Sequence, residues 1–309
     1  MSNKTPLYPA HVDAGGRMVE FAGWSLPIRY GSLVDEHHAV RRAAGMFDVS
    51  HMTVVDLQGA GARDFLRRLL ANDVDKIAEP GQAIYGCMLD EQGGILDDLI
   101  SYRLEDDFYR LVVNAATRES DLDWIRRQAD GHALDVIERD DLAMLAVQGP
   151  EAVGHLVDLL KLPGLADLKP FRSMLHGDLF LARTGYTGED GFEVVLPNAE
   201  ADPLWRALLA RGVVPCGLGA RDSLRLEAGL NLYGQDMDTG TTPLESNLAW
   251  TVAFDPEARD FIGRTALERQ RNQGVSRQLV GLLFEAGGIP RHGARVVTEA
   301  GDGVVTSGG

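Results

Sequence analysis

Two adjacent aspartates, Asp97 and Asp98, stand in a stretch that alternates like a β-strand, where carboxylates are uncommon. Because side chains alternate between the two faces of a strand, these carboxylates point in opposite directions. The even-numbered positions are apolar apart from Asp98, namely Leu96, Ile100, Tyr102 and Leu104. The odd-numbered positions form a mixed face that we expect to be the wetter one, namely Ile95, Asp97, Leu99, Ser101 and Arg103.

Asp98 is therefore predicted to be a carboxylate among hydrophobic side chains. Desolvation raises the pKa of such a group unless a hydrogen-bond donor compensates. A carboxyl group of this kind can move protons or orient a ligand amine. The alternative, that both aspartates belong to a solvated turn, stays open here. A metal site is disfavoured, because the two side chains diverge and no neighbouring His or Glu completes a ligand set.

A β-hairpin is predicted to position Asp98. Residues 82–89 and 95–104 have strand character, and the polar loop between them ends in two glycines that tolerate positive φ. A third strand is expected at 108–113, followed by a helix at 117–128 with acidic residues early and arginines late. Asp98 is thus expected in the second strand of this hairpin.

A second unit of similar build is expected further along the chain. The strand, Gln-Gly turn and helix pattern of 53–70 returns in 143–160, with apolar residues at matching positions. Such units also recur by chance, so the repeat alone leaves the question open. Further helices are expected at 33–44, 201–210 and 217–226, and the order of elements favours an α+β fold over a parallel α/β sheet.

The composition limits the class of protein and the kinds of partner it can bind. The chain has 309 residues, 45% hydrophobic and 25% charged, which is typical of a globular protein of two or three domains. Its net charge of −16 disfavours binding to nucleic acid or anionic membranes. No apolar run is long enough to span a bilayer and no signal peptide is visible, so we expect a cytoplasmic protein.

Other residue clusters carry weaker signals. His37, His38 and His51 lack the spacing of metal ligands, and two cysteines are too few for a disulfide scaffold. The Gly-x-Gly at 217–219 is no dinucleotide fingerprint, but it is typical of a tight helix entry that presents Arg221 to an anionic or carbonyl group. Neither a nucleophile elbow nor a phosphate-binding loop is present.

Six ordered motifs connect these observations. They are Phe-Ala-Gly-Trp at 21–24, Gly-Met-Phe-Asp-Val-Ser-His-Met at 45–52, Gly-Gly-Ile-Leu-Asp-Asp at 93–98, and the segments 183–193, 217–227 and 232–237. In this order the motifs resemble the aminomethyltransferase, or T-protein, family of the glycine cleavage system. The resemblance covers residues 5–309.

The resemblance implies a three-domain cloverleaf with tetrahydrofolate in its central hole. Two interlocked α+β modules are expected, the first from residues 1–50 plus 140–250 with the folate site, and the second from 51–139 with Asp98. Residues 251–309 are expected to form a β-barrel-like C-terminal domain. We expect this domain to be incomplete, since members of the family continue beyond Ser307 and Gly308.

The implied reaction uses two substrates. An aminomethyl group arrives on the lipoyl arm of H-protein, a transient partner, and its methylene carbon passes to folate N5. The products are ammonia, 5,10-methylenetetrahydrofolate and a dihydrolipoyl arm. The resemblance therefore implies an enzyme with tetrahydrofolate as co-substrate and no metal.

The resemblance also assigns roles to single residues. Asp98 matches the catalytic carboxylate, and Glu193 matches the acid that accepts hydrogen bonds from the pterin 2-amino group and ring N–H. Tyr186 and Arg221 match further folate-site residues. Four more positions resemble residues lining the pocket, although a plain core role stays open for the aromatic ones: Met52, Tyr85, Tyr102 and Trp250.

Three other functions compete with this one. A folate-binding regulator of iron–sulfur enzyme maturation shares the fold but has a cysteine motif near residues 232–235, where this sequence has no Cys. The folate domains of sarcosine and dimethylglycine dehydrogenases are normally fused to a flavin domain, and we expect no such domain before residue 1. A non-catalytic interaction protein would leave Asp98 on an apolar face without explanation.

Overall fold

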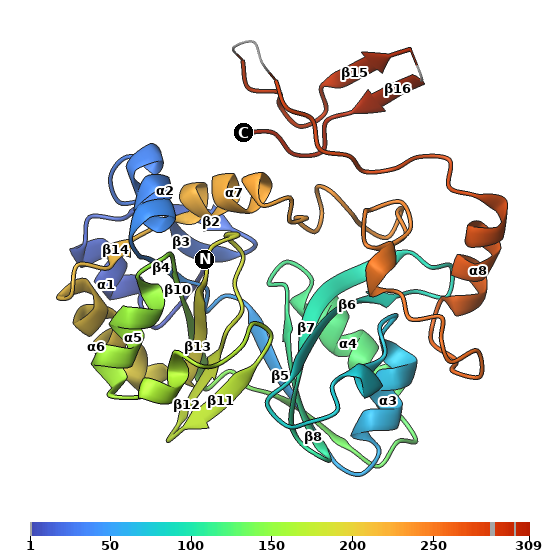
Figure 1. Cartoon of the computed structure of the whole chain (residues 1–309), viewed down its shortest axis with the longest axis horizontal. Coiled ribbons are helices and arrows are strands. Elements are labelled where there is room, and N and C mark those ends of the chain that lie inside the picture. The colour runs from blue at the N-terminus through green and yellow to red at the C-terminus, as the bar shows by residue number, and fades with distance from the viewer. Residues whose placement is uncertain (1, 285–287, 300) are drawn as a thin grey trace.

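The computed structural model describes residues 2–284, 288–299 and 301–309. Two sheets with flanking helices stand side by side, and the last residues form a hairpin beyond them (Figure 1). The fold is therefore mixed α+β. Among the described residues, no helix is long and apolar enough to cross a membrane.

A five-stranded antiparallel sheet carries Asp98. Its strands, in spatial order, are β6 (Ala83–Leu89), β7 (Ile95–Glu105), β8 (Phe108–Val113), β5 (Thr53–Gln58) and β9 (Asp135–Glu138). Helices α3 (Ala62–Leu69) and α4 (Arg118–Ala129) accompany this sheet, with the short turn η1 (Val74–Lys76). Apolar residues of both helices and of the sheet form one buried cluster that includes Phe65, Leu99 and Ile125.

A six-stranded sheet carries Glu193. Its spatial order is β11 (Ser173–His176), β12 (Leu179–Ala182), β13 (Gly191–Pro197), β10 (Leu142–Gln148), β4 (Gly45–Asp48) and β14 (Val214–Pro215). Helices α5 (Ala152–Leu160) and α6 (Asn198–Leu209) pack on one face around Trp205, which is 1% exposed, and η2 (Pro163–Leu165) follows α5.

The other face of the six-stranded sheet turns toward helices α2 (Leu33–Arg42) and α7 (Leu218–Glu227). The buried cluster there includes Phe47 and Leu224, and it also contains Tyr102 from the five-stranded sheet. The two sheets therefore share a core. Near the N-terminus lie α1 (Tyr8–Asp13) and a small sheet of β1 (Asn3–Lys4), β3 (Trp24–Arg29) and β2 (Arg17–Phe21).

The repeat in the sequence corresponds to two matched strand–turn–helix units, β5–α3 and β10–α5. The chain passes from one sheet to the other between β4 and β5, and returns between β9 and β10. Gly59 and Gly149 occupy equivalent turns with φ of 138° and 127°. A Cβ at either glycine would lie 2.4 Å from a carbonyl oxygen, that of Ala133 or Ala43, so a larger residue is excluded at both.

Residues 251–309 divide into two parts. The first follows η3 (Ala249–Thr251), holds α8 (Arg264–Gln273), and packs on the β6 side of the five-stranded sheet through Phe261 and Leu267. In the second, the described residues form the hairpin of β15 (Arg295–Thr298) and β16 (Gly301–Val304). In the described part of 251–309, these elements do not close into the expected β-barrel-like domain.

Candidate active site

Strand β7 turns Asp98 toward the six-stranded sheet and Asp97 away from it. The prediction of a wetter odd-numbered face was wrong: Asp97 and Ser101 are 0% exposed and Leu99 is 2% exposed. The reason is that α3 and α4 cover this face and bury it. Asp98 and Ile100 on the even-numbered face are only half-buried. The side chain of Asp98 thus lies on the accessible face, where a ligand can reach it.

Two hydrogen-bond donors hold the Asp98 carboxylate. The Tyr85 hydroxyl donates to Oδ2 at 2.9 Å, and Asn114 Nδ2 donates to Oδ1 at 3.0 Å. Burial and the nearby charge of Asp97 raise the pKa of Asp98 to about 7, although both hydrogen bonds oppose this shift. A carboxyl group with this pKa exchanges protons readily near neutral pH.

Asn114 is a site residue that sequence reasoning missed. Its side-chain amide also donates to Asp97 Oδ1 at 2.8 Å, and its backbone N–H donates to Asp97 Oδ2 at 2.9 Å. It therefore fixes both aspartates at once. A bulge near the end of the hairpin, between Arg103 and Glu105, sets the register in which Ile100 pairs with Val112 and Asn114 lies beside Asp98.

Asp97 is part of a buried acidic pair behind Asp98. Burial and the neighbouring carboxyl of Asp121 raise the pKa of Asp97 well above its ordinary value. Asp121 is 1% exposed, and its own pKa is raised to about 7 by burial. The contact between the two carboxyl groups raises the pKa of Asp97 and lowers that of Asp121, while burial raises both.

Glu193 occupies β13 in the six-stranded sheet and is 7% exposed. Its Oε2 accepts a hydrogen bond from the Thr184 hydroxyl at 2.6 Å, and Thr184 Oγ1 lies 3.0 Å from the hydroxyl of Tyr102. Burial raises the pKa of Glu193, while Thr184 and the positive charge of Arg221 oppose the rise. Tyr102 therefore belongs to the Glu193 side of the site, although it comes from β7.

Arg221 and Tyr186 form a third group. Helix α7 begins at Leu218, as the Gly-x-Gly entry predicted, and Arg221 stands in its first turn. The guanidinium lies 4.6 Å from the centre of the Tyr186 ring, a cation–π contact. Among the described residues, the buried Nη1 of Arg221 has no hydrogen-bond partner.

His51 is close enough to Arg221 for that positive charge to act on its imidazole, and the sequence assigned it no role in the site. It is 3% exposed, and its Nδ1 has no partner in the described part of the chain. Burial and the charge of Arg221 lower the pKa of His51 to about 4, so the imidazole is neutral at physiological pH. No group of three or more potential metal ligands gathers among the described residues.

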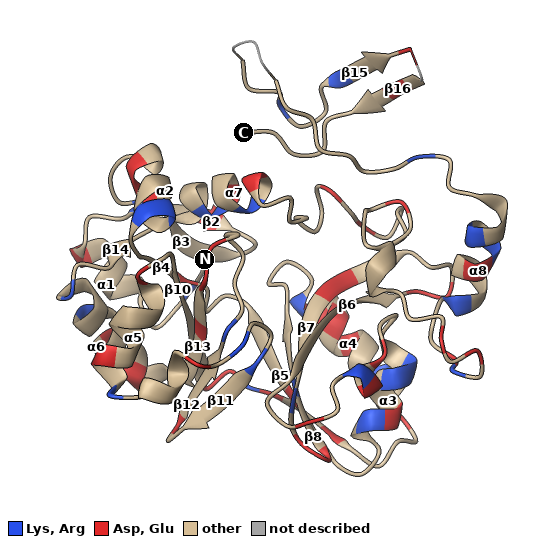
Figure 2. Cartoon of the chain, in the orientation of Figure 1, with Lys and Arg blue, Asp and Glu red and all other residues tan. Residues whose placement is uncertain are grey.

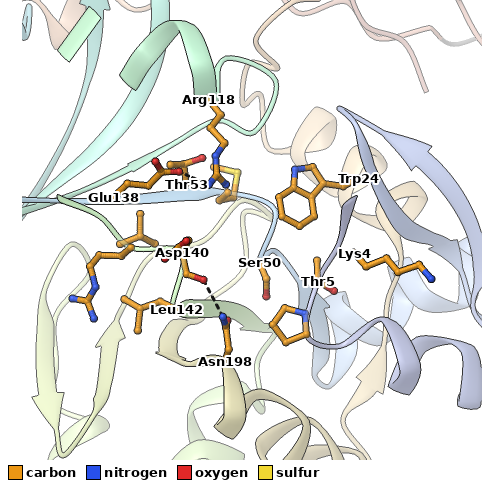
Figure 3. Close-up of a pocket in the computed structure, with 14 residues that line it drawn as sticks. Lys4, Thr5, Trp24, Ser50, Thr53, Arg118, Glu138, Asp140, Leu142 and Asn198 are labelled. Atoms are coloured by element: carbon orange, nitrogen blue, oxygen red, sulfur yellow. Dashed lines mark hydrogen bonds and ion pairs between the residues drawn. The ribbon is translucent and has the colours of Figure 1, made fainter. Parts of the chain in front are cut away.

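Trp250 and Met52 lie at the edge of the candidate site. Trp250 is 66% exposed and stacks on Tyr85, with ring centres 5.9 Å apart and an interplanar angle of 27°. Met52 packs on the same buried cluster as Ile100 and Tyr102, and it is one of the residues lining a separate cavity between the sheets. Figure 3 shows this cavity. None of the other seven expected site residues lines that cavity.

Electrostatic effects link the residues of this region. The charge of Asp98 contributes to the raised pKa of Tyr85 and of Tyr186. The positive charge of Arg221 opposes the rise in the pKa of Glu193. The structure thus brings an acid poised near neutrality, a buried carboxylate and an arginine around one region between the modules. This arrangement can bind a polar heterocycle and take up a proton from it.

Comparison with known proteins identifies the family. Residues 7–256 match the family described as "GCVT N-terminal domain". An aminomethyltransferase of Methylococcus capsulatus is 57% identical, with all of this chain aligned to 86% of that protein. One of Xanthomonas axonopodis is 59% identical, with all of this chain aligned to 85% of it. The chain belongs to the aminomethyltransferase family.

A solved structure gives the same result. The aminomethyltransferase T of the glycine cleavage system of Bartonella henselae superposes with a TM-score of 0.95 at 40% identity. The match covers all of this chain and 86% of that one. The prediction of a glycine cleavage aminomethyltransferase with a mixed α+β fold is therefore confirmed.

Proposed function

We propose that the chain uses tetrahydrofolate as acceptor and H-protein as donor, with Asp98 as the catalytic carboxylate. When bound, tetrahydrofolate supplies the nucleophilic nitrogen that takes up the methylene carbon. The observation that carries the proposal is the half-buried Asp98, held by Tyr85 and Asn114, with its pKa raised to about 7.

Asp98 acts as the proton acceptor in this proposal. Its ionised form takes a proton from a folate nitrogen, and its neutral form can return that proton to the departing amine or sulfur. A group with a pKa near the working pH serves both steps well. Tyr85 and Asn114 fix the orientation of the carboxylate. Their hydrogen bonds also lower its pKa, so that Asp98 does not need a still higher pH to ionise.

Glu193 and Arg221 fit the edge of a pterin. Thr184 is the one hydrogen-bond donor to Glu193 among the described residues, and it contacts only Oε2. Oε1 is then available to an amino group and ring N–H, which a carboxylate pairs with well. Arg221 has a buried nitrogen without a partner, which would donate to a carbonyl oxygen. The residues present therefore suit this co-substrate.

The remaining positions play supporting roles in the proposal. Tyr186 orients Arg221 through the cation–π contact, and Tyr102 orients Thr184. Met52 packs in the same cluster as Ile100 and Tyr102, and Tyr85 with Trp250 forms an aromatic surface beside Asp98. We also propose the division into modules 1–50 plus 140–250 and 51–139, since the chain crosses between the sheets at β4–β5 and β9–β10.

Reconstitution tests the proposal directly. The chain is titrated calorimetrically with tetrahydrofolate and then supplied with H-protein loaded with the aminomethyl group. We expect saturable folate binding and ammonia release that requires both substrates. Ammonia release at the same rate without tetrahydrofolate would contradict the assignment of the acceptor.

A further inference from the structure

A buried pair of carboxyl groups lies behind Asp98, on the face of β7 that helices α3 and α4 cover. Acidic residues of β7 and α4 lie side by side there (Figure 2), and the carboxyl groups of Asp97 and Asp121 are in hydrogen-bond contact. Asp97 is 0% exposed and Asp121 is 1% exposed. Among the described residues, the buried Oδ2 of Asp121 has no hydrogen-bond partner. The reaction proposed above leaves this pair without a role.

The pair needs one proton. Both oxygens of Asp97 accept hydrogen bonds from Asn114, one from its backbone N–H and one from its side-chain amide. Two ionised carboxylates in contact repel, and a buried carboxylate oxygen without a donor is costly. One proton between the two groups removes the repulsion and gives Oδ2 of Asp121 a partner. The pair then carries a single negative charge.

In the described part of the chain, no cation offsets that charge. Besides each other, the groups that act most strongly on the two carboxyls are Asn114, Thr117 and Asp98, and none of them is basic. Two titratable groups face the pair from other elements, Cys87 on β6 and Tyr233 after α7. Burial raises the pKa of both, so both are neutral near neutral pH. The charge of the pair therefore acts on Asp98 without compensation.

The positions of the two carboxyl groups decide where the charge rests. Asp121 is in the first turn of α4, where the helix dipole favours a negative charge. Asp97 is inside β7 and next in sequence to Asp98, so a charge there repels that of Asp98 more strongly. The contact accordingly makes Asp97 the weaker acid of the two. The proton thus rests mainly on Asp97 and the negative charge mainly on Asp121.

We propose that Asp121 is a positioning residue for Asp98: it shares one proton with Asp97 and so keeps most of the negative charge on α4, away from the catalytic carboxylate. Asn114 completes the connection, because the amide that Asp97 holds also donates to Asp98 Oδ1 at 3.0 Å. Thr117 fixes Asp121 relative to Asn114. Its hydroxyl donates to the Asn114 carbonyl at 3.2 Å, and its carbonyl accepts from the Asp121 N–H at 2.8 Å. This inference rests on the proposed function, since it concerns the carboxylate assigned to catalysis.

Asp121→Asn tests the inference, because the amide keeps the shape of the side chain but cannot hold the charge. Its NH2 group becomes a third donor to Asp97 beside the two from Asn114, and a carboxylate with three such donors is ionised. The whole charge then stands next to Asp98 and raises its pKa. The acidic limb of kcat for ammonia release should move up by about half to one pH unit, part of the roughly 1–3 units that a full neighbouring charge produces.

Two further variants fix the sign of the effect. Asp123→Asn makes the same change at an exposed position of α4 and should leave the limb in place. The double variant Asp97→Asn with Asp121→Asn removes all the charge of the pair, so its limb should lie below that of the wild type. An unmoved limb in Asp121→Asn would overturn the inference, whether or not kcat falls at every pH, because a merely structural role predicts that result. An upward shift in the double variant would also overturn it.

Direct titration of Asp98 gives a readout that needs no turnover. Aspartate labelled with ¹³C at the side-chain carboxyl is followed by NMR, and the signal missing from Asp98→Asn identifies Asp98. Its midpoint should shift in the same directions as the acidic limb. If the midpoint stays fixed in Asp121→Asn while the wild type releases ammonia, the inference fails alone. If the midpoint moves as expected but the wild type releases no ammonia from loaded H-protein, the proposed function fails instead.

Discussion

Asp98 and Glu193 are two carboxylates on different sheets, and the charges that act on them differ in sign. Each is buried enough for its pKa to rise, and each accepts a hydrogen bond from a hydroxyl. The charge of Asp97 raises the pKa of Asp98 further, whereas the positive charge of Arg221 opposes the rise in the pKa of Glu193. The neighbouring charge therefore adds to the effect of burial on the pKa of Asp98 and opposes the effect of burial on the pKa of Glu193.

This difference separates the two roles. A carboxyl group driven toward neutrality suits proton transfer, because it holds and releases a proton near the working pH. A neighbouring guanidinium favours the ionised form of a carboxyl group, and that form suits the binding of N–H donors. Both arise from an aspartate or glutamate in a strand, so the neighbouring charge, not the residue type, decides the chemistry.

The largest effect is expected from Asp98→Asn. The amide keeps the shape but can take up no proton, so turnover should fall about 10²–10⁴-fold, the usual range for a positioned acid or base. Tetrahydrofolate affinity should change little, because Asp98 is not the group that holds the pterin edge. Steady-state ammonia release checks this, and a rate within twofold of wild type would remove Asp98 from the mechanism.

Glu193→Ala should affect binding instead of turnover. Loss of hydrogen bonds to a charged carboxylate is worth about 1.5–3 kcal/mol, which is roughly a 10- to 150-fold weaker Kd for tetrahydrofolate. Calorimetry measures it, with Glu189→Ala as a control, since Glu189 pairs with Arg41 outside the site. An unchanged Kd would show that Glu193 does not bind the pterin, and the comparison with Asp98 would fail.

Tyr85→Phe should shift the pH profile. The hydroxyl stabilises the ionised form of Asp98, so it lowers the pKa of that carboxyl, and its removal raises the pKa. Turnover that depends on ionised Asp98 falls as the pH drops through about 7 in the wild type. In the variant this acidic limb should move up by about half to one pH unit, the value of one neutral hydrogen bond. A shift to lower pH would contradict the assignment.

The smallest effect is expected in stability. The pKa of Asp98 is raised from 3.8 to about 7 in the folded chain, so its contribution to stability is present below pH 4 and is lost as the pH rises toward 7. Asp98→Asn removes a buried charge at pH 8 but not at pH 5. The melting temperature of the variant should therefore exceed that of the wild type by more at pH 8. Scanning calorimetry at both values tests this, and an equal difference at both would argue for a solvated Asp98.

Much of the architecture was open to prediction from the sequence. The alternation in 95–104 located β7 and set Asp98 apart from Asp97, and the Gly-x-Gly at 217–219 located the start of α7 and the position of Arg221. The repeated Gln-Gly turns marked two matched units, because only glycine fits beside the carbonyls of Ala133 and Ala43. These signals are local, since each follows from backbone geometry or from the period of side chains along a strand.

The tertiary structure alone decided which face of β7 is buried and which groups surround its carboxylates. Alternation distinguishes two faces but does not say which of them α3 and α4 will cover. An unbroken hairpin through residues 105 and 108 would pair Asp98 with Ala115, and the bulge that places Asn114 there has no local signal. The bonds of Thr184 to Glu193 and Tyr102, and the cavity between the sheets, join segments far apart in sequence. The sequence determined the elements because their causes are local, whereas pKa values and binding groups depend on charges and donors that only folding brings together.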